Sequence, residues 1–178
     1  MTSPRAARPA AVLIGPPGAG KSAIGPLLAE RLGTSFHDTD AEIEATAGQP
    51  VSDIFIEQGE QVFRELERAA AARALREQAE VGGVVALGSG ALLDSGLHPL
   101  LEGLPVVYLA TDFGTIARRL GLDRPRVVVP GNPRGQLRAM LEERRPLYER
   151  LATVTVQTDD DDPDELAEAI AGQLGDRR

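Results

Sequence analysis

The eight residues GPPGAGKS, at positions 15–22, are the strongest indication of the fold of this chain. They match the pattern G-x-x-x-x-G-K-[ST]. An apolar run at 11–14 precedes them, and residues 21–32 follow with the apolar spacing of a helix that ends at Gly33. A strand, a glycine-rich loop and a helix in this order are typical of a phosphate-binding loop.

The residues of this loop predict how a nucleoside triphosphate is bound. The backbone can turn so that successive N–H groups of Gly18, Ala19 and Gly20 point at phosphate oxygens, and the amino end of the helix adds partial positive charge. We expect Lys21 to bridge the β- and γ-phosphates and Ser22 to bind Mg²⁺. Lys21 is also the only lysine among 19 basic residues, as expected where a compact ammonium group is required.

Strands and helices alternate along the rest of the chain. Apolar runs predict four more strands, at 34–38, 84–87, 105–110 and 153–158. Helices are expected at 40–47, 60–78, 112–120 and 134–150, and after Asp162-Pro163, which supplies a cap and a first-turn proline. This alternation predicts an α/β fold, a three-layer α/β/α sandwich around a five-stranded parallel sheet. Pro26 falls inside the first helix and is expected to kink it or to lie on its exposed side.

The composition argues against several classes of protein. With 178 residues, 42% of them hydrophobic, the chain fits one domain, which we place at 11–178 after a disordered segment at 1–10. A net charge of −8 and a pI of about 4.8 argue against nucleic acid as a partner. There is no cysteine, and no apolar run is long enough for a membrane span. We expect a cytoplasmic monomer, without membrane association, that acts on a small molecule.

Charged residues after the second strand indicate a binding site for a hydroxylated acid. Asp38 and Asp40 lie at the carboxyl end of that strand, where open α/β sheets bind their ligands. Arg64 lies on a helix near Phe55 and Phe63, and an arginine among aromatic rings suits a small anion. Simpler explanations remain open: a helix N-cap at Asp40, a surface salt bridge for the arginine, and core positions for the phenylalanines.

Longer segments are more distinctive than the loop alone. They are DTDAEIE at 38–44, DIFIEQGEQVFRELE at 53–67, GSG at 88–90, VVYL at 106–109, RP at 124–125 and RRPLYERLA at 144–152. With the loop at 15–22 they resemble the shikimate kinase family, from residue 12 nearly to the carboxyl terminus. The resemblance implies the fold of the nucleoside-monophosphate kinases and transfer of the γ-phosphoryl group of ATP to the 3-hydroxyl of shikimate.

The resemblance also implies roles on the acceptor side of the site. Asp40 would bind ring hydroxyls and orient or deprotonate the attacking one, while Arg64 and Arg144 would grip the carboxylate. Asp38 would support the Mg²⁺ shell beside Ser22. The residues implied to bind the acceptor are Asp40, Arg64, Gly88, Ser89, Gly90 and Arg144.

On the nucleotide side, the resemblance implies a lid at about 119–133 and a substrate-binding region at about 38–66. Arg124 would close from the lid over the transferring phosphates, where a cation stabilises the developing charge. Either Arg118 or Arg119 would stack on adenine, and Pro163 would line the adenine loop. The neighbouring arginines are not distinguished by the sequence.

Three departures from the family pattern bear on the acceptor and the nucleotide. Ser89 replaces the middle residue of a three-glycine run, where a positive φ would strain it. Arg126-Val127 stand in the lid in place of two leucines, and Asp161 stands where an arginine is frequent. Two alternatives follow: a related kinase of another hydroxy acid such as gluconate, and a non-catalytic nucleotide-binding regulator.

Overall fold

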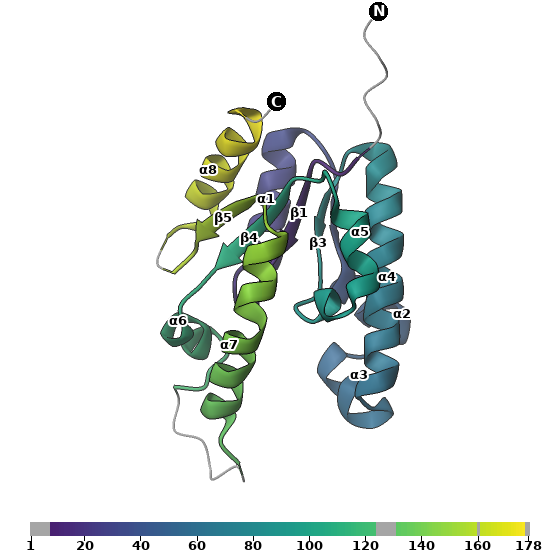
Figure 1. Cartoon of the computed structure of the whole chain (residues 1–178), viewed down its shortest axis with the longest axis vertical. Coiled ribbons are helices and arrows are strands. Elements are labelled where there is room, and N and C mark those ends of the chain that lie inside the picture. The colour runs from purple at the N-terminus through teal and green to yellow at the C-terminus, as the bar shows by residue number, and fades with distance from the viewer. Residues whose placement is uncertain (1–7, 124–130, 160, 177–178) are drawn as a thin grey trace, which may run out of the picture.

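The computed structural model describes residues 8–123, 131–159 and 161–176. Its centre is a five-stranded parallel sheet in the order β2-β3-β1-β4-β5 (Figure 1). The strands are β1 Ala11–Ile14, β2 Phe36–Asp38, β3 Val84–Ala86, β4 Val106–Ala110 and β5 Val154–Gln157. The predicted strands and the parallel sheet are confirmed. β1 lies in the middle because the chain first forms β2 at one edge and then places β3 between β2 and β1. The last two strands, β4 and β5, are added on the other side of β1.

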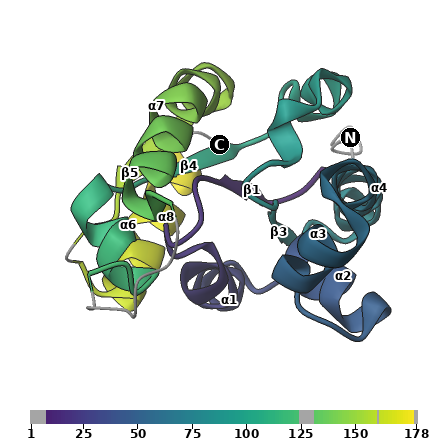
Figure 2. The same ribbon diagram turned by 90° about the horizontal axis from the view of Figure 1, so that it is seen from below.

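Helices cover both faces of the sheet. They are α1 Lys21–Leu32, α2 Thr39–Ala47, α3 Val51–Gln58, α4 Glu60–Val81, α5 His98–Leu101, α6 Phe113–Arg119, α7 Pro133–Leu151 and α8 Pro163–Asp176, with 3-10 turns η1 Ala91–Leu93 and η2 Ser95–Leu97. Seen from below, α1 and α7 lie on opposite sides of the sheet (Figure 2). The predicted three layers are therefore confirmed.

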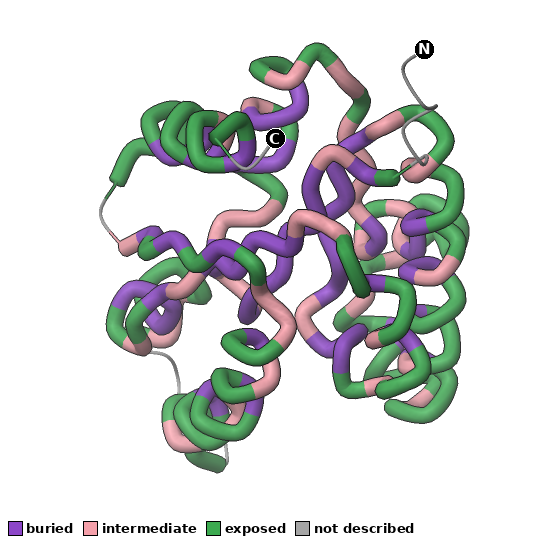
Figure 3. Tube along the Cα trace, turned by 45° about the horizontal axis from the view of Figure 1, so that its top comes forward, coloured by how far each residue is buried: buried purple, intermediate pink, exposed green. Residues whose placement is uncertain are grey.

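Alternate residues of the central strands pack into two separate hydrophobic cores, one on each face of the sheet. Leu13 of β1 packs with α1 and α8 on one face, whereas Val12 and Ile14 pack with α4, α5 and α7 on the other. The strands β1, β3 and β4 are almost entirely buried, β5 alternates buried and exposed residues, and β2 is partly buried. The tube in Figure 3 shows buried segments at the centre of the molecule and exposed ones at its periphery. Burial on both faces explains why β1, β3 and β4 read as continuous apolar runs instead of alternating ones.

The helix α3 was not expected from the sequence. Pro50 precedes it, Gly59 ends it with a φ of 89°, and Ile54 is fully buried between α2 and α4. The proline and glycine boundaries are a helix signal that the sequence does carry; Ile54 is the one fully buried side chain of this short helix, and Val51 packs against the same core while partly exposed. Pro26 lies on the exposed side of α1, which continues past it.

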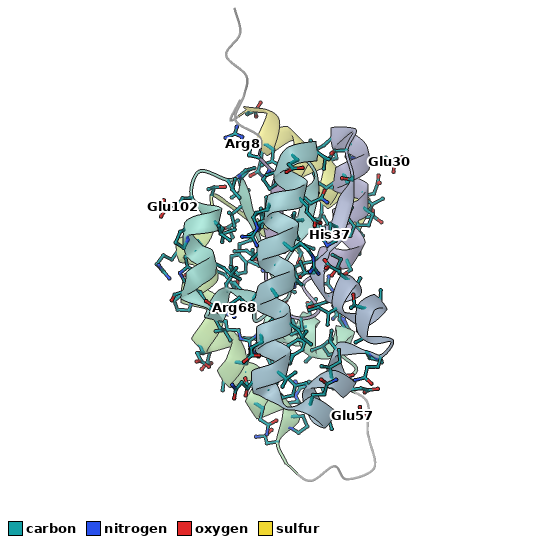
Figure 4. All side chains as sticks on the ribbon, turned by 90° about the vertical axis from the view of Figure 1, so that its right-hand side faces the viewer. Arg8, Glu30, His37, Glu57, Arg68 and Glu102 are labelled. Carbon is teal, nitrogen blue, oxygen red and sulfur yellow. The ribbon has the colours of Figure 1, made fainter. Side chains whose placement is uncertain are left out.

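A small satellite core joins the helices that follow β2. Ile43 of α2, Ile54 of α3, and Phe63 and Ala70 of α4 pack together, apart from the sheet. In Figure 1, α3 and the lower half of α4 extend beyond the sheet at the lower end of the molecule. Charged side chains such as Glu57 and Arg68 lie on the outside of this region (Figure 4). The helices α2 and α3 are thus held by packing on α4 and form a platform beside the carboxyl ends of the strands.

No helix in the described part of the chain is both long and apolar enough to cross a membrane.

Candidate active site

The phosphate loop runs from the carboxyl end of β1 to the amino end of α1. Gly18 and Gly20 have φ values of 76° and 98°, which side-chain-bearing residues rarely adopt, so the turn depends on glycine at both positions. Gly20 is the residue directly before α1, whose first turn holds no acidic side chain. The backbone N–H groups and the helix dipole at this point therefore favour an anion.

The side chain of Lys21 folds back against the start of the phosphate loop. Its Nζ donates hydrogen bonds to the carbonyls of Gly15 at 2.7 Å and Pro16 at 3.0 Å. Burial lowers the pKa of Lys21 to about 8, and the nearby carboxylates of Asp40 and Asp38 offset part of this effect. The ammonium group is therefore desolvated and close to the site of the phosphate tail, where an anionic ligand would favour its charged form.

Asp38 joins the loop to the platform of α2. Its Oδ2 accepts a hydrogen bond from Ser22 Oγ at 2.6 Å, and its Oδ1 accepts from the backbone N–H groups of Asp40 and Ala41. Asp38, rather than Asp40, is thus the N-cap of α2. A serine hydroxyl and a carboxylate form the oxygen donor set that Mg²⁺ prefers, so the two residues fit this cation.

Asp40 presents an unsatisfied acceptor in the site. Its Oδ1 is buried and accepts no hydrogen bond from the residues that the structure describes. Burial, followed by the negative charge of Glu67, raises the pKa of Asp40 to about 6, against the opposing effect of Lys21. A buried carboxylate whose pKa lies near neutrality is suited to accept a hydroxyl proton.

Arg64 is fixed by a buried carboxylate. Arg64 Nη1 donates to Glu67 Oε2 at 2.6 Å, and the side chain of Glu67 is only 2% exposed. The Arg64 guanidinium also lies 5.4 Å from the ring centroid of Phe63 and 6.0 Å from that of Phe55. The helical salt bridge considered from the sequence is therefore present, and it holds the arginine at the edge of the 88–90 loop.

Arg144 reaches the same loop from α7. Its Nη1 donates to the Ser89 carbonyl at 3.2 Å and lies 3.4 Å from Ser89 Oγ. The side chain is buried, unlike that of a surface salt bridge. No non-glycine residue in the described ranges has a positive φ, so the strain considered for Ser89 is absent. The serine is accommodated without the backbone conformation that would have required glycine.

A cavity of about 550 Å³ opens beside the phosphate loop, within the range of small-molecule sites. Arg119 lines it, and its guanidinium donates to the carbonyls of Gly18, Thr158 and Asp159. Arg118 does not line this cavity, and its guanidinium lies 3.4 Å from Thr115 Oγ1. The residues that line the cavity are 17–24, Asp38, Asp40, Arg119, Thr158, Asp161, Pro163 and Leu166.

The structure brings most of the expected residues to one edge of the sheet. The loop residues, Asp38, Asp40, Arg119 and Pro163 line one cavity. Next to it, Gly88 lies beside Asp40, Arg64 lies beside Gly90, and Arg144 contacts Ser89. Arg124 and Arg126 lie outside the described residues.

Sequence reasoning missed three residues that hold the site in place, Thr39, Tyr148 and Thr158, and it missed the backbone contact of Glu67. Thr39 Oγ1 accepts from the Gly88 N–H, and Glu67 Oε1 accepts from the Gly90 N–H. Thr158 Oγ1 donates to the Ala19 carbonyl inside the phosphate loop, and the Tyr148 hydroxyl donates to the Ser89 carbonyl. Their partners are mostly backbone atoms distant in sequence, which leave no pattern in the residue types. The position of Glu67 three residues after Arg64 was the one available signal.

The loop between β1 and α1, the partly buried Lys21 at its end and the nearby carboxylates define a P-loop kinase with the nucleoside-monophosphate-kinase-like fold. The family model of shikimate kinase matches residues 17–174. The shikimate kinase of Thermobifida fusca is 54% identical over 167 residues, which cover 94% of this chain and 95% of that protein. The chain belongs to the shikimate kinase family and is an ATP-dependent kinase.

Further relatives agree with this placement. The shikimate kinase of Salinispora arenicola is 48% identical over 166 residues, covering 93% of this chain and 98% of that protein. A solved structure of shikimate kinase from Acinetobacter baumannii, in complex with shikimate, has a TM-score of 0.83 at 33% identity and covers 97% of this chain and 96% of that one.

Proposed function

We propose that the chain transfers the γ-phosphoryl group of ATP to the 3-hydroxyl of shikimate, giving shikimate 3-phosphate and ADP. The observation that carries this proposal is the convergence of Arg64 and Arg144 on the 88–90 loop, beside the unsatisfied Asp40. The two guanidinium groups suit the carboxylate of a substrate, and the Asp40 carboxylate can accept hydrogen bonds from the ring hydroxyls of that substrate. The relatives named as shikimate kinases, one of them solved with shikimate, support this choice of acceptor.

Asp40 supplies the proton chemistry in this proposal. Its free oxygen accepts a hydrogen bond from the attacking hydroxyl of the acceptor and takes the proton as the new O–P bond forms. Because the pKa of Asp40 is raised to about 6, the group is ionised at neutral pH and still basic enough to take part. Arg64 and Arg144 orient the ring by holding its carboxylate, which reduces the entropic cost of reaching the reactive geometry.

The phosphate loop supplies the binding and charge stabilisation of the nucleotide. Gly18, Ala19 and Gly20 offer backbone N–H groups, and Lys21 offers its ammonium group in place of its present carbonyl contacts. Ser22 and Asp38 would hold Mg²⁺, which neutralises phosphate charge when bound. Arg119 and Pro163, both in the cavity lining, are proposed to contact adenine.

Other parts of the assignment rest on the family resemblance. We assign residues 38–66 to acceptor binding and 119–133 to a lid, from which Arg124 would reach the transferring phosphates. The chain is proposed to act as a monomer in the cytoplasm, as one domain from residue 11 onward.

A coupled assay of ADP release tests the proposal. The purified protein with ATP and Mg²⁺ should turn over shikimate and leave gluconate and quinate unphosphorylated. Turnover with gluconate alone would assign the chain to another acceptor. If well-folded protein released no ADP with any of the three acids, the proposed reaction would be contradicted.

A further inference from the structure

The peptide bond between Ser89 and Gly90 is held on both sides by side chains. Its carbonyl accepts hydrogen bonds from the Tyr148 hydroxyl at 2.6 Å and from Arg144 Nη1 at 3.2 Å. Its N–H donates to Glu67 Oε1 at 3.1 Å. Because the two ends of a peptide unit point in opposite directions, these contacts together prevent rotation of the unit.

This one peptide unit connects the two arginines of the proposed acceptor site. Arg144 contacts it directly through the carbonyl, and Arg64 contacts it indirectly, since Glu67 binds both the Gly90 N–H and Arg64 Nη1. A Cβ at position 90 would lie 1.8 Å from Arg64 Nη1, so only glycine lets the arginine approach this closely. The 89–90 peptide therefore sets the separation of the two guanidinium groups.

Tyr148 makes the shortest of the contacts to this peptide and has no role in the proposed chemistry. Its side chain is 2% exposed and packs on Tyr108, with 5.2 Å between ring centroids. Burial raises the pKa of Tyr148 to about 12, so the hydroxyl keeps its proton and remains a donor throughout the range in which an enzyme of this kind operates. Its hydroxyl reaches from α7, across the core, to a carbonyl 59 residues earlier in the chain.

We infer that Tyr148 is a positioning residue for the acceptor: its hydroxyl locks the Ser89–Gly90 peptide and thereby fixes Arg144 relative to Arg64. This inference rests on the proposed function, because the two arginines matter only if they grip an acid. Tyr148 acts through Arg144 and contacts neither the nucleotide loop nor Asp40 in the described structure. Its effect is therefore confined to the affinity for the acid.

The variant Tyr148→Phe tests the inference because it removes the hydroxyl and keeps the ring against Tyr108. The KM for shikimate should rise about three- to tenfold, the effect of losing one hydrogen bond, while the KM for ATP stays unchanged. Tyr108→Phe, which removes the only other tyrosine hydroxyl of the chain, is the matched control and should leave both KM values unchanged.

A double-mutant cycle separates positioning from a general loss of structure. In an Arg144→Ala background, Tyr148→Phe should change the KM for shikimate less than about twofold, since its effect passes through Arg144. The same multiplicative rise in both backgrounds, or a parallel rise in the KM for ATP, would overturn the inference.

Amide hydrogen exchange of Gly90, measured by NMR on the free protein, reports how firmly the Ser89–Gly90 peptide is held and needs no turnover. Exchange should be faster in Tyr148→Phe than in the wild-type protein and the Tyr108→Phe control. Unchanged exchange would overturn the inference even in an active enzyme. If the wild-type protein were inactive with shikimate, the proposed function would be overturned instead. The exchange rates of the Gly90 amide in the wild type and in Tyr148→Phe would then still show whether the Tyr148 hydroxyl restrains the peptide.

Discussion

Replacing Asp40 with asparagine should stabilise the folded protein while abolishing most of its activity. Burial and the charge of Glu67 raise the pKa of Asp40 from 3.8 to about 6. A folded-state pKa above the unfolded value means that the protonated form favours folding, so this contribution is complete below about pH 4 and is lost as the pH rises through 6. At neutral pH the ionised carboxylate therefore costs about 3 kcal/mol of stability.

The amide side chain of the Asp40→Asn variant carries no charge, so the free energy of unfolding should increase at about pH 7.5. The increase should be about 1–3 kcal/mol, because burying an amide without hydrogen-bond partners offsets part of the gain. At about pH 5 the wild-type carboxyl is mostly protonated when folded, and about 1.4 kcal/mol of the difference should disappear. Urea denaturation of both proteins at the two pH values, without ligands, measures this.

Activity should move in the opposite direction. Removing a general base typically costs about 10²-fold or more, so the kcat of Asp40→Asn should fall by at least that factor. A variant that is less stable than the wild type at neutral pH, or a stability difference that is the same at both pH values, would refute the electrostatic reasoning. Near-normal kcat would refute the role in proton transfer.

Three further variants separate the nucleotide side of the site from the acceptor side. Lys21→Ala should lower kcat by about 10³-fold with little change in melting temperature, and a near-normal rate would remove the phosphate-loop mechanism. Arg144→Ala should raise the KM for shikimate by about tenfold or more in steady-state assays, and an equal rise in the KM for ATP would end its assigned role. Thr158→Val should raise the KM for ATP about three- to tenfold, because the buried Thr158 hydroxyl donates to the Ala19 carbonyl of the loop; a change in the KM for shikimate alone would contradict this.

The central part of the fold could be predicted because its signals are local. β1, β3 and β4 are buried on both faces and therefore appear as uninterrupted apolar runs, and the loop at 15–22 fixes the helix that follows. The helix α3 was missed although Val51, Ile54 and Phe55 have helical spacing, because it is only eight residues long and lies between Pro50 and Gly59, which read as breaks in the chain. The short helices between β3 and β4 are single turns whose boundaries depend on tertiary contacts.

Site residues could be predicted where the side chain itself has a charge that suits the reaction. Lys21, Asp40 and Arg144 stand out as charges in distinctive segments, but burial decides their properties, and the sequence does not reveal that Glu67 would raise the pKa of Asp40. Arg118 and Arg119 are adjacent, so only the path of α6 shows that Arg119 lines the cavity.

The N-cap at Asp38 and the contact of Tyr148 depend on backbone geometry. They became visible only in the folded chain.

Phosphorus NMR of the reaction products identifies which hydroxyl group receives the phosphoryl group of ATP. The protein should be mixed with ATP, Mg²⁺ and equal amounts of shikimate and gluconate, and the spectrum followed over time. The proposed reaction predicts that the γ-phosphate signal of ATP declines as one new phosphomonoester signal grows, coupled to the proton at carbon 3 of shikimate. A phosphomonoester on gluconate, or inorganic phosphate and ADP without any phosphomonoester, would contradict it.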